Sequence, residues 1–398
     1  MSLPTLATLL AAPGGVRGRR VFVRADLNVP LADGRVADDS RIRASLPTLR
    51  RLLAAGARVV VASHLGRPKG TPSGALSLRP VAAALAGLLQ RGVAFSEDCV
   101  GPEAKRAVEE LRDGELLLLE NLRFHEGETK NDPAFARALA DLADVYVNDA
   151  FGTSHRAHAS TVGVVPLVAA AAAGDLLRGE LERLSVVREP RRPLLCLLGG
   201  AKVSDKLAVL EALAPHADVL ALGGAMAYTF LRARGEPTGD SLVEPDRLDD
   251  ARRVIAAAER SGRRLLLPSD HVVAQRIEAN ASHRISATIP DGWRGVDIGP
   301  ETAAAFASEA RRAGTIFWNG PMGVFELEPF GCGTEAVARA VAESKGISVV
   351  GGGDSLAAIQ RLGLADRIGH LSTGGGASLE YVQGLTLPGV AALEVAGS

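Results

Sequence analysis

Short apolar runs alternate with longer helical patterns along the chain, and this alternation constrains the fold more than any other feature. Runs such as Arg58–Ala62 have the length and composition of buried strands, whereas Ile42–Ala55 repeats apolar residues near the helical period. Strands that alternate with helices form parallel sheets with helices on both faces. The predicted strands are Arg20–Val23, Arg58–Ala62, Val93–Phe95, Leu116–Leu119, Asp144–Val147, Leu194–Leu198, Val219–Leu222, Leu265–Pro268, Thr315–Trp318 and Ser348–Val350.

The length of the chain predicts two domains. A single hydrophobic core rarely grows past about 250–300 residues, and this chain has 398. Because the alternation occurs in both halves, we expect an α/β protein with two Rossmann-like domains, each a mostly parallel sheet with helices on both faces. Between the halves, a charged amphipathic pattern is followed by Glu189-Pro190. We therefore predict an N-terminal domain over residues 1–174, a hinge helix over 175–189 and a C-terminal domain over 190–381.

Charge and cysteine content narrow the class of protein. The net charge of −1 gives no overall reason to expect binding to nucleic acids or membranes. The three cysteines lie far apart and show neither zinc-ligand spacing nor a disulfide pattern, as in proteins of a reducing compartment. The apolar run Val162–Ala173 contains Pro166 and is shorter than the roughly 20 residues of a membrane span. Since the N-terminus also lacks the pattern of a signal peptide, we expect a cytoplasmic protein.

Polar and cationic residues follow the predicted strands of the first half. In open α/β sheets, ligands bind beyond the carboxyl ends of the strands. Arginine and histidine at these positions suit carboxylates and phosphates, so the pattern predicts a crevice for a small polyanion. The alternative is a set of surface arginines paired with Asp26 and Asp149. The residues expected in the crevice are Arg24, Asp26, Asn28, Arg41, Ser63, His64, Gly66, Arg67, Glu120, Asn121, Arg123, Asn148, Asp149, Gly152, Thr153, His155, Arg156 and His158.

Glycine replaces arginine at the corresponding positions of the second half. Glycines let a ligand approach the backbone, and helix N-termini offer free N–H groups, so these loops predict a site for nucleotide phosphates. Lys202 and Lys206 lie one helical turn apart, and Asp354 offers a carboxylate to a Mg²⁺ ion bound to those phosphates. The alternative is that the glycines serve tight turns and helix packing only. The loops are Gly199–Lys202, Gly223–Gly224, Trp318–Glu326, Gly351–Ser355 and Gly374–Gly376.

Two widespread nucleotide-binding motifs are absent from the sequence. There is no G-x-x-x-x-G-K-[ST], which excludes a P-loop enzyme, and no G-x-G-x-x-G after a strand, which argues against a dinucleotide-dependent dehydrogenase. The residues by themselves thus indicate a kinase that acts on a small acid, with an anion crevice in one domain and a nucleotide site in the other.

Several long segments resemble signature motifs of the phosphoglycerate kinase family, in family order from near residue 21 to the end of the chain. The segments are Val23–Pro30, His64–Pro68, Glu120–Phe124, Asn148–His158, Gly199–Lys206, Trp318–Glu326, Gly351–Ser355 and Ser372–Glu380. The resemblance implies a glycolytic, Mg²⁺-dependent enzyme that reversibly transfers a phosphoryl group from 1,3-bisphosphoglycerate to ADP, giving 3-phosphoglycerate and ATP. It also implies that the segment 382–398 packs back onto the N-terminal domain.

The family pattern assigns roles to the matching positions, with phosphoglycerate in the N-terminal domain and ADP or ATP in the C-terminal domain. It implies that Glu326 holds the ribose and that Asp354 engages the metal. Ser355 stands where the family usually has threonine, and the hydroxyl is kept. The implied phosphoglycerate ligands are Asp26, Asn28, Arg41, His64, Arg67, Arg123, His155 and Arg156. The implied nucleotide ligands are Gly200, Ala201, Lys206, Gly224, Gly295, Gly320, Glu326, Gly352, Gly353, Asp354 and Ser355.

We expect direct in-line transfer after hinge closure, because phosphoryl transfer needs positioning and charge stabilisation rather than a covalent intermediate. Arg41 and Lys202 would flank the transferring group, and Lys206 and Mg²⁺ would hold the nucleotide phosphates. The loop Gly374–Gly376 would add N–H donors from a helix N-terminus. Two alternatives remain: another kinase that forms an acyl phosphate, and a non-catalytic scaffold that binds nucleotide. We also expect a monomer that binds neither nucleic acid nor membranes.

Overall fold

The structure is a computed structural model that describes residues 3–397. The chain divides into two compact units, one formed by Met1–Glu182 with Thr386–Ser398 and the other by Arg183–Leu385. We call them the N-terminal and the C-terminal unit. Helix α7 (Asp175–Arg188) crosses the boundary between them in sequence. Within residues 3–397, no helix combines the length and the apolar character that a membrane crossing requires.

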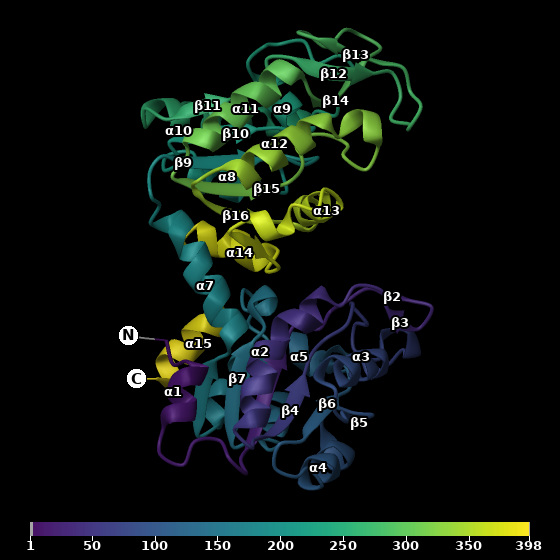
Figure 1. Cartoon of the computed structure of the whole chain (residues 1–398), viewed down its shortest axis with the longest axis vertical. Coiled ribbons are helices and arrows are strands. Elements are labelled where there is room, and N and C mark those ends of the chain that lie inside the picture. The colour runs from purple at the N-terminus through teal and green to yellow at the C-terminus, as the bar shows by residue number, and fades with distance from the viewer. Residues whose placement is uncertain (1–2, 398) are drawn as a thin grey trace. The chain divides into compact units, whose positions relative to one another are not determined.

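The N-terminal unit is built on a six-stranded parallel sheet in the order β5-β6-β4-β1-β7-β8 (Figure 1). Its strands are β1 (Arg20–Ala25), β4 (Arg58–Ala62), β5 (Ala94–Ser96), β6 (Leu116–Leu119), β7 (Val145–Asp149) and β8 (Ala170–Ala173). A short β2–β3 hairpin (Leu31–Ala32, Arg35–Val36) precedes the second helix. The helices of this unit are α1 (Leu6–Ala11), α2 (Ser40–Ala54), α3 (Arg79–Leu89), α4 (Gly101–Glu109), α5 (Glu126–Thr129), α6 (Pro133–Ala140) and α15 (Pro388–Ala396).

Both faces of this sheet are buried, as expected for parallel strands covered by helices. In β1, Val21 and Val23 pack against α2 and α3 on one face, while Phe22 and Arg24 point into the layer on the other face. Single-turn helices line the connections, namely η1 (Gly74–Leu76), η2 (Leu122–Phe124), η3 (Phe151–Thr153), η4 (Ala159–Gly163) and η5 (Val165–Leu167). Helix α15 packs against β8 and η4, and the Gly389 N–H donates to the Ser154 carbonyl at 2.9 Å.

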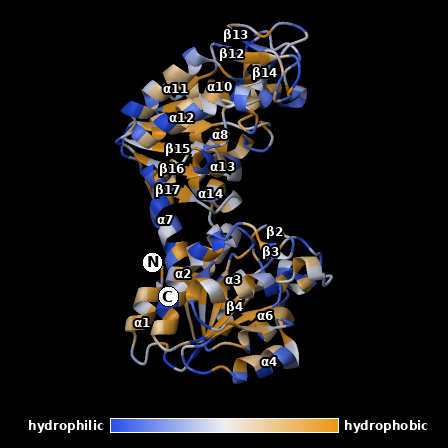
Figure 2. Cartoon of the chain, turned by 45° about the vertical axis from the view of Figure 1, so that its right-hand side comes forward, coloured by the Kyte–Doolittle hydropathy of each residue, from blue (hydrophilic) through white to orange (hydrophobic). Residues whose placement is uncertain are grey.

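The C-terminal unit contains a second six-stranded parallel sheet, ordered β11-β10-β9-β15-β16-β17. Numbered along the chain, this is the 3-2-1-4-5-6 order that is typical of Rossmann folds. Orange strands are visible in this unit in Figure 2, and β9 and β10 consist entirely of apolar residues. The strands of the sheet are β9 (Leu194–Leu198), β10 (Val219–Leu222), β11 (Arg264–Leu266), β15 (Thr315–Asn319), β16 (Ile347–Gly351) and β17 (His370–Ser372).

Helices α11, α12 and α13 pack their alanines and larger apolar side chains against one face of this sheet. A separate antiparallel sheet is ordered β13-β12-β14, with β12 at His271–Ala274, β13 at His283–Ser286 and β14 at Arg294–Ile298. The α-helices of this unit are α8 (Leu207–Leu213), α9 (Met226–Ala233), α10 (Leu248–Arg260), α11 (Pro300–Arg312), α12 (Cys332–Glu343), α13 (Gly353–Arg361) and α14 (Gly376–Val382). The 3-10 helices are η6 (Pro245–Arg247), η7 (Glu328–Phe330) and η8 (Ala365–Arg367).

The predicted α/β class, with two parallel sheets flanked by helices, is confirmed. Strands β4, β6, β9 and β10 have the bounds that the sequence predicts. The sequence does not predict β8, β17 or the three-stranded antiparallel sheet, all of which the structure contains. Strand β8 consists of four alanines, and alanine has little preference for strands, so its pairing with β7 is a tertiary effect.

Asp149, at the end of β7, turns toward α7 instead of pairing with an arginine. It is fully buried, and its Oδ1 accepts a hydrogen bond from the Leu176 N–H at 2.9 Å. Burial raises the pKa of Asp149 to about 8, although hydrogen bonds to the carboxylate oppose the rise. The folded protein therefore holds a proton here between about pH 4 and pH 8 that the unfolded chain has already released.

Folding stability should consequently fall as pH rises through this window, by up to about 1.4 kcal/mol per pH unit from this one group. Asp149→Asn stays uncharged, so its stability relative to the wild type should improve between pH 5 and pH 7.5. Urea unfolding at both pH values measures the difference. Asp141→Asn is the control, because Asp141 is exposed and pairs with Lys105 on the surface. Parallel pH trends in the wild type and Asp149→Asn would contradict the protonated state.

Candidate active site

The sheet of the N-terminal unit has its switch point between β1 and β7. The chain passes from β1 to β4 on one side and later returns to β7 on the other side, which opens a crevice at the carboxyl ends of these strands. Asp26 follows β1 directly, and Asn148 is the next-to-last residue of β7. The predicted anion-binding loops leave this edge of the sheet.

A cationic pocket of about 480 Å³ lies at these loops. Arg67 follows β4, Arg123 follows β6 and Arg156 follows β7, and all three line it. Lys69 and Lys130 also line the pocket. Neither was predicted, because the prediction considered only residues that closely follow a strand. Their signal in the sequence is the rarity of lysine in an arginine-rich chain. The remaining lining residues are Gly70, His125, Glu126 and Thr129.

Arg123 is the most constrained cation of this pocket. Its Nη1 donates to the Gly66 carbonyl at 2.7 Å, while its Nε is buried without a hydrogen-bond partner. Burial and the neighbouring charges of Arg24 and Arg156 lower the pKa of Arg123 to about 10. An anion in the pocket would satisfy the Nε–H and offset the repulsion among these guanidinium groups.

Arg41 and Asp26 form an ion pair at the same edge. Arg41 lies in the first turn of α2, and its Nη1 is 2.5 Å from Asp26 Oδ2. A third of the Arg41 side chain is exposed (33%), so its other N–H groups remain accessible. Asn28 stabilises the loop after β4, because its Oδ1 accepts a hydrogen bond from the Gly66 N–H at 2.9 Å.

Arg24 and His64 are buried and are not among the residues that line the pocket. Arg24 is fully buried, donates to Ser160 Oγ at 2.7 Å and lies 3.2 Å from His64 Nδ1. Burial and the charge of Arg24 lower the pKa of His64 well below its usual value, so this ring is neutral. Burial and Arg156 likewise lower the pKa of the half-buried His155 to about 4. Both histidines therefore act as neutral hydrogen-bonding groups at physiological pH.

Glu128 is a member of this buried network that the sequence did not predict. It is fully buried in α5 and accepts hydrogen bonds from Ser160, at 2.6 Å from Oγ and 3.0 Å from the backbone N–H. It lies 4.0 Å from Arg24 and 3.6 Å from His158. Burial alone would raise the pKa of Glu128, but His158, Arg24 and Ser160 together hold it below its ordinary value. Glu128 therefore compensates the buried charge of Arg24.

Glu128→Gln should lower the free energy of unfolding by about 3–5 kcal/mol, because it leaves the Arg24 guanidinium buried without a counter-charge. Urea unfolding at pH 7 measures the loss. Glu126→Gln is a matched control two residues earlier, since Glu126 is exposed and pairs with Lys130 on the surface. This control should change stability by less than about 1 kcal/mol. Equal effects of the two substitutions would remove the proposed role of Glu128.

Several predicted strand-end residues hold the loops in shape. Glu120 accepts from Ser77 Oγ at 2.6 Å and from the Leu78 N–H at 2.8 Å. Asn121 donates to the Leu65 carbonyl at 2.7 Å, and Asn148 Oδ1 accepts from the Ala150 N–H at 3.0 Å. These contacts give the residues a structural role at the edge where the cationic pocket lies.

In the C-terminal unit the switch point lies between β9 and β15, and the glycine loops meet there. The Gly200 N–H donates to the Pro321 carbonyl at 3.1 Å, and the Gly224 N–H donates to the Met322 carbonyl at 2.9 Å. A Cβ atom on Gly199 would lie 2.1 Å from the Pro321 oxygen. Close backbone packing thus requires glycine here, as the packing alternative predicted, whatever these loops bind.

Lys206 lies over the end of β15. Its Nζ donates to the Asn319 carbonyl at 3.0 Å and also contacts Asn319 Oδ1. Burial lowers the pKa of Lys206 to about 8, although the charges of Asp354 and Asp205 oppose this. Lys202 and Ala201 are exposed in the loop that precedes α8.

Helix α13 begins at this edge with free backbone donors. It starts at Gly353 after Gly352, which has a φ of 92°, and no side chain caps its first turn. Asp354 is exposed in this turn. Ser355 is buried, and its Oγ accepts from the Gly320 N–H at 2.6 Å, which ties α13 to the loop after β15. The second glycine-rich helix start is Gly374–Gly376, where Gly375 is the N-cap of α14.

Gly295 lies outside these loops, and Glu326 is the last residue of the loop Trp318–Glu326. Gly295 belongs to β14 of the small antiparallel sheet, where a Cβ atom would lie 2.2 Å from the Tyr228 hydroxyl. Glu326 is exposed in the segment between β15 and α12. Their predicted contacts with the nucleotide stay predictions.

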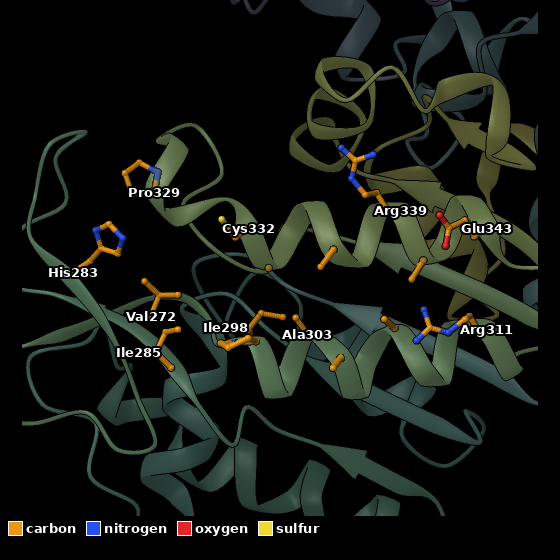
Figure 3. A pocket seen from close by; sticks show the side chains of 16 residues that line it. Val272, His283, Ile285, Ile298, Ala303, Arg311, Pro329, Cys332, Arg339 and Glu343 are labelled. Atoms are coloured by element: carbon orange, nitrogen blue, oxygen red, sulfur yellow. The ribbon is translucent and has the colours of Figure 1, made fainter.

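An apolar pocket of about 680 Å³ lies elsewhere in this unit, between α11, α12 and the antiparallel sheet (Figure 3). Val272 and Ile285 lie at one end, and Arg311 and Glu343 lie at the other. Alanines of the two helices line the space between them. Its lining includes none of the residues predicted to bind the nucleotide, so its size does not identify it as the active site.

A cationic pocket at one switch point, and a lysine with free helix N–H groups at another, define an α/β phosphotransferase that handles phosphorylated substrates. A family model described as phosphoglycerate kinase matches residues 13–385. The chain belongs to the phosphoglycerate kinase family, and the family predicted from the sequence motifs is confirmed.

Relatives and solved structures agree with this assignment. The chain is 56% identical to phosphoglycerate kinase of Moorella thermoacetica over 381 residues, covering 95% of this chain and 97% of the relative. It is 58% identical to the Rubrobacter xylanophilus protein of the same name over 381 residues, covering 95% and 96%. The structure of phosphoglycerate kinase from Coxiella burnetii superposes with a TM-score of 0.90 at 39% identity, covering 99% of both chains.

Proposed function

We propose that this protein catalyses the reversible transfer of a phosphoryl group from 1,3-bisphosphoglycerate to ADP, giving 3-phosphoglycerate and ATP in glycolysis. Membership of the phosphoglycerate kinase family carries the proposal. The cationic pocket supports it, because five cationic side chains, Arg67, Lys69, Arg123, Lys130 and Arg156, line the same space as a single acid, Glu126. A substrate with both a phosphate and a carboxyl group matches such a pocket better than acetate or carbamate does.

We assign substrate binding to the N-terminal domain over residues 1–174, with 382–398 packed against it, and nucleotide binding to residues 190–381. Residues 175–189 connect the two as a hinge. In the first domain, Arg67, Arg123 and Arg156 bind the anion directly, with the neutral rings of His64 and His155 as further hydrogen-bonding groups. Because Arg24 is fully buried, we assign it a positioning role beneath the pocket.

In the second domain, Lys206 and the N–H groups at Gly352–Asp354 bind the nucleotide phosphates. Asp354 is suited to be a magnesium ligand, because it is an exposed carboxylate in the first turn of α13. It is also close enough to Lys206 for its charge to raise the pKa of that lysine. Proteins usually bind Mg²⁺ through one or two carboxylates, and the phosphates of the substrate supply further ligands. Bound there, Mg²⁺ would neutralise phosphate charge.

Transfer is direct and in line, and it needs no general base, because the attacking carboxylate of 3-phosphoglycerate is already ionised at neutral pH. Arg41 stabilises the charge on the transferring phosphoryl group from the substrate side, and Lys202 does so from the nucleotide side. Hinge closure would bring the two bound substrates together and exclude water, which would otherwise hydrolyse ATP. We also propose that the enzyme acts as a monomer in the cytoplasm.

A coupled assay tests the proposal by following ATP consumption in the presence of Mg²⁺ with one of three acceptors. We expect consumption with 3-phosphoglycerate and none above background with acetate or carbamate. Turnover of acetate or carbamate alone would indicate another acyl-phosphate kinase. Binding of ADP without turnover of any acceptor would indicate a non-catalytic scaffold. Either outcome would overturn the proposed function.

A further inference from the structure

A cluster of three metal-ligating side chains lies beside the cationic pocket and has no role in the proposed reaction. Ligand atoms of Asp98, Cys99 and His125 all lie within 4.8 Å of one another. Within residues 3–397, this is the only group of His, Cys, Asp and Glu side chains close enough to hold a metal ion. Asp98 and Cys99 follow β5, and His125 precedes α5, so two separate loops meet here.

The distance between two of the ligand atoms can be compared with the spacing of ligands around a tetrahedral ion. His125 Nε2 lies 2.7 Å from Asp98 Oδ1. Ligand atoms that are each about 2.0–2.1 Å from a tetrahedral ion are roughly 3.4 Å apart, so a small opening of this pair would admit one. Contacts behind the ligands hold them in place, because the Phe135 ring stacks on His125 at 5.3 Å and the Cys99 N–H donates to Asp98 Oδ1 at 2.6 Å.

Burial and charge also favour a cation at this place. Cys99 is 1% exposed, whereas Asp98 and His125 are only half-buried, which leaves an ion a path to the thiol. The Asp98 carboxylate would attract a metal ion, whose charge would stabilise the thiolate of Cys99 as a ligand.

We propose that Asp98, Cys99 and His125 bind one divalent transition-metal ion of the Zn²⁺ type, separate from the Mg²⁺ that accompanies the nucleotide. Sulfur and imidazole ligands select Zn²⁺ and its neighbours over Mg²⁺ and Ca²⁺, which prefer oxygen. Three protein ligands leave a fourth position open for water or an anion. Because His125 also lines the cationic pocket, the ion would add positive charge beside the anion site and tie its loops together.

The experiment titrates the full-length, reduced and chelator-treated protein with Co²⁺, which reports thiolate ligation by a charge-transfer band in the near ultraviolet. We expect the band to saturate at one Co²⁺ per chain and to disappear when Zn²⁺ is added. Cys99→Ser should abolish the band. Cys332→Ser should keep it, because Cys332 is the exposed cysteine and lies in α12. A wild-type protein without the band, or a band that survives in Cys99→Ser, overturns the proposal.

Two further variants keep the test independent of any folding defect in Cys99→Ser. Asp98→Asn and His125→Asn leave the thiol in place, and each should weaken Zn²⁺ binding at least tenfold in competition with a chromogenic chelator. Circular dichroism establishes that each variant is folded. Unchanged Zn²⁺ affinity in both would show that the Asp98–His125 contact is only a hydrogen bond, which also overturns the proposal. The assay with 3-phosphoglycerate is separate, so the metal site and the proposed function can fail independently.

Discussion

Arg41→Ala should lower kcat by about 10²–10³-fold while changing the KM for 3-phosphoglycerate by only a few fold. An arginine that stabilises charge on a transferring phosphoryl group acts mainly in the transition state, so its loss reduces turnover more than ground-state binding. The ion pair with Asp26 at 2.5 Å already orients the guanidinium from the first turn of α2. Steady-state kinetics with 3-phosphoglycerate and ATP measure both constants.

Arg43→Ala is the matched control for this substitution. Arg43 lies two residues further along α2, is exposed and pairs at 2.8 Å with Asp39, the N-cap residue of the same helix. Its removal should leave kcat within about twofold, because exposed i,i+4 pairs contribute only about 0.3–0.5 kcal/mol. Arg41→Lys adds a second control, since lysine keeps the charge without the planar fork and should recover only part of the rate. If Arg41→Ala raised KM with kcat unchanged, Arg41 would bind the ground state and the transition state equally and would have no specific role in the transfer step.

Lys206→Ala should weaken ADP binding and lower kcat/KM for the nucleotide by about 10²–10³-fold. Its ammonium group is held over the end of β15 by Asn319, where the charge of Asp354 also reaches it. A charge in a largely dehydrated position acts more strongly on phosphates than one in water. Calorimetric titration with ADP and Mg²⁺, together with kinetics, measures the effect. Lys105→Ala is the control, because Lys105 is exposed in the N-terminal unit and pairs with Asp141.

The lowered pKa of Lys206 also predicts the pH dependence of ADP binding. Because this pKa is about 8, the free enzyme loses the ammonium charge as pH rises through 8, and ADP binding must then recover a proton. Affinity for ADP should therefore fall several-fold between pH 7 and pH 9 in the wild type. Lys206→Arg keeps its charge over this range and should lose this dependence. An equal fall in the wild type and in Lys206→Arg would assign the titration to another group.

The parallel sheets could be predicted because their strands are continuous apolar runs between helical patterns. Strands β4 and β9 illustrate this, since nearly all their residues are buried. The antiparallel sheet could not, because β13 has the burial pattern of an exposed edge and carries no apolar run. Strand β8 was missed because its alanines become a strand only through pairing with β7 and burial under α15.

The candidate site was predictable to the extent that it follows strand ends. Arg67, Arg123 and Arg156 come from three different loops and line one pocket, as the topology of a parallel sheet requires. Arg24 lies one residue before the end of β1, where alternation along the strand puts it on the same buried face as Phe22. Glu128 was beyond prediction, because its burial depends on η4, which packs against α5 and supplies Ser160.

Helix α15 belongs to the N-terminal unit, although it follows the C-terminal unit in the sequence. Residues 386–398 complete the N-terminal unit, yet the ribosome makes them after the whole of residues 183–385. The unit that emerges first is therefore the last to be finished, and the alanines of β8 stay uncovered while the other unit is translated. A chaperone that masks exposed apolar surface would have its longest opportunity on this edge of the nascent chain.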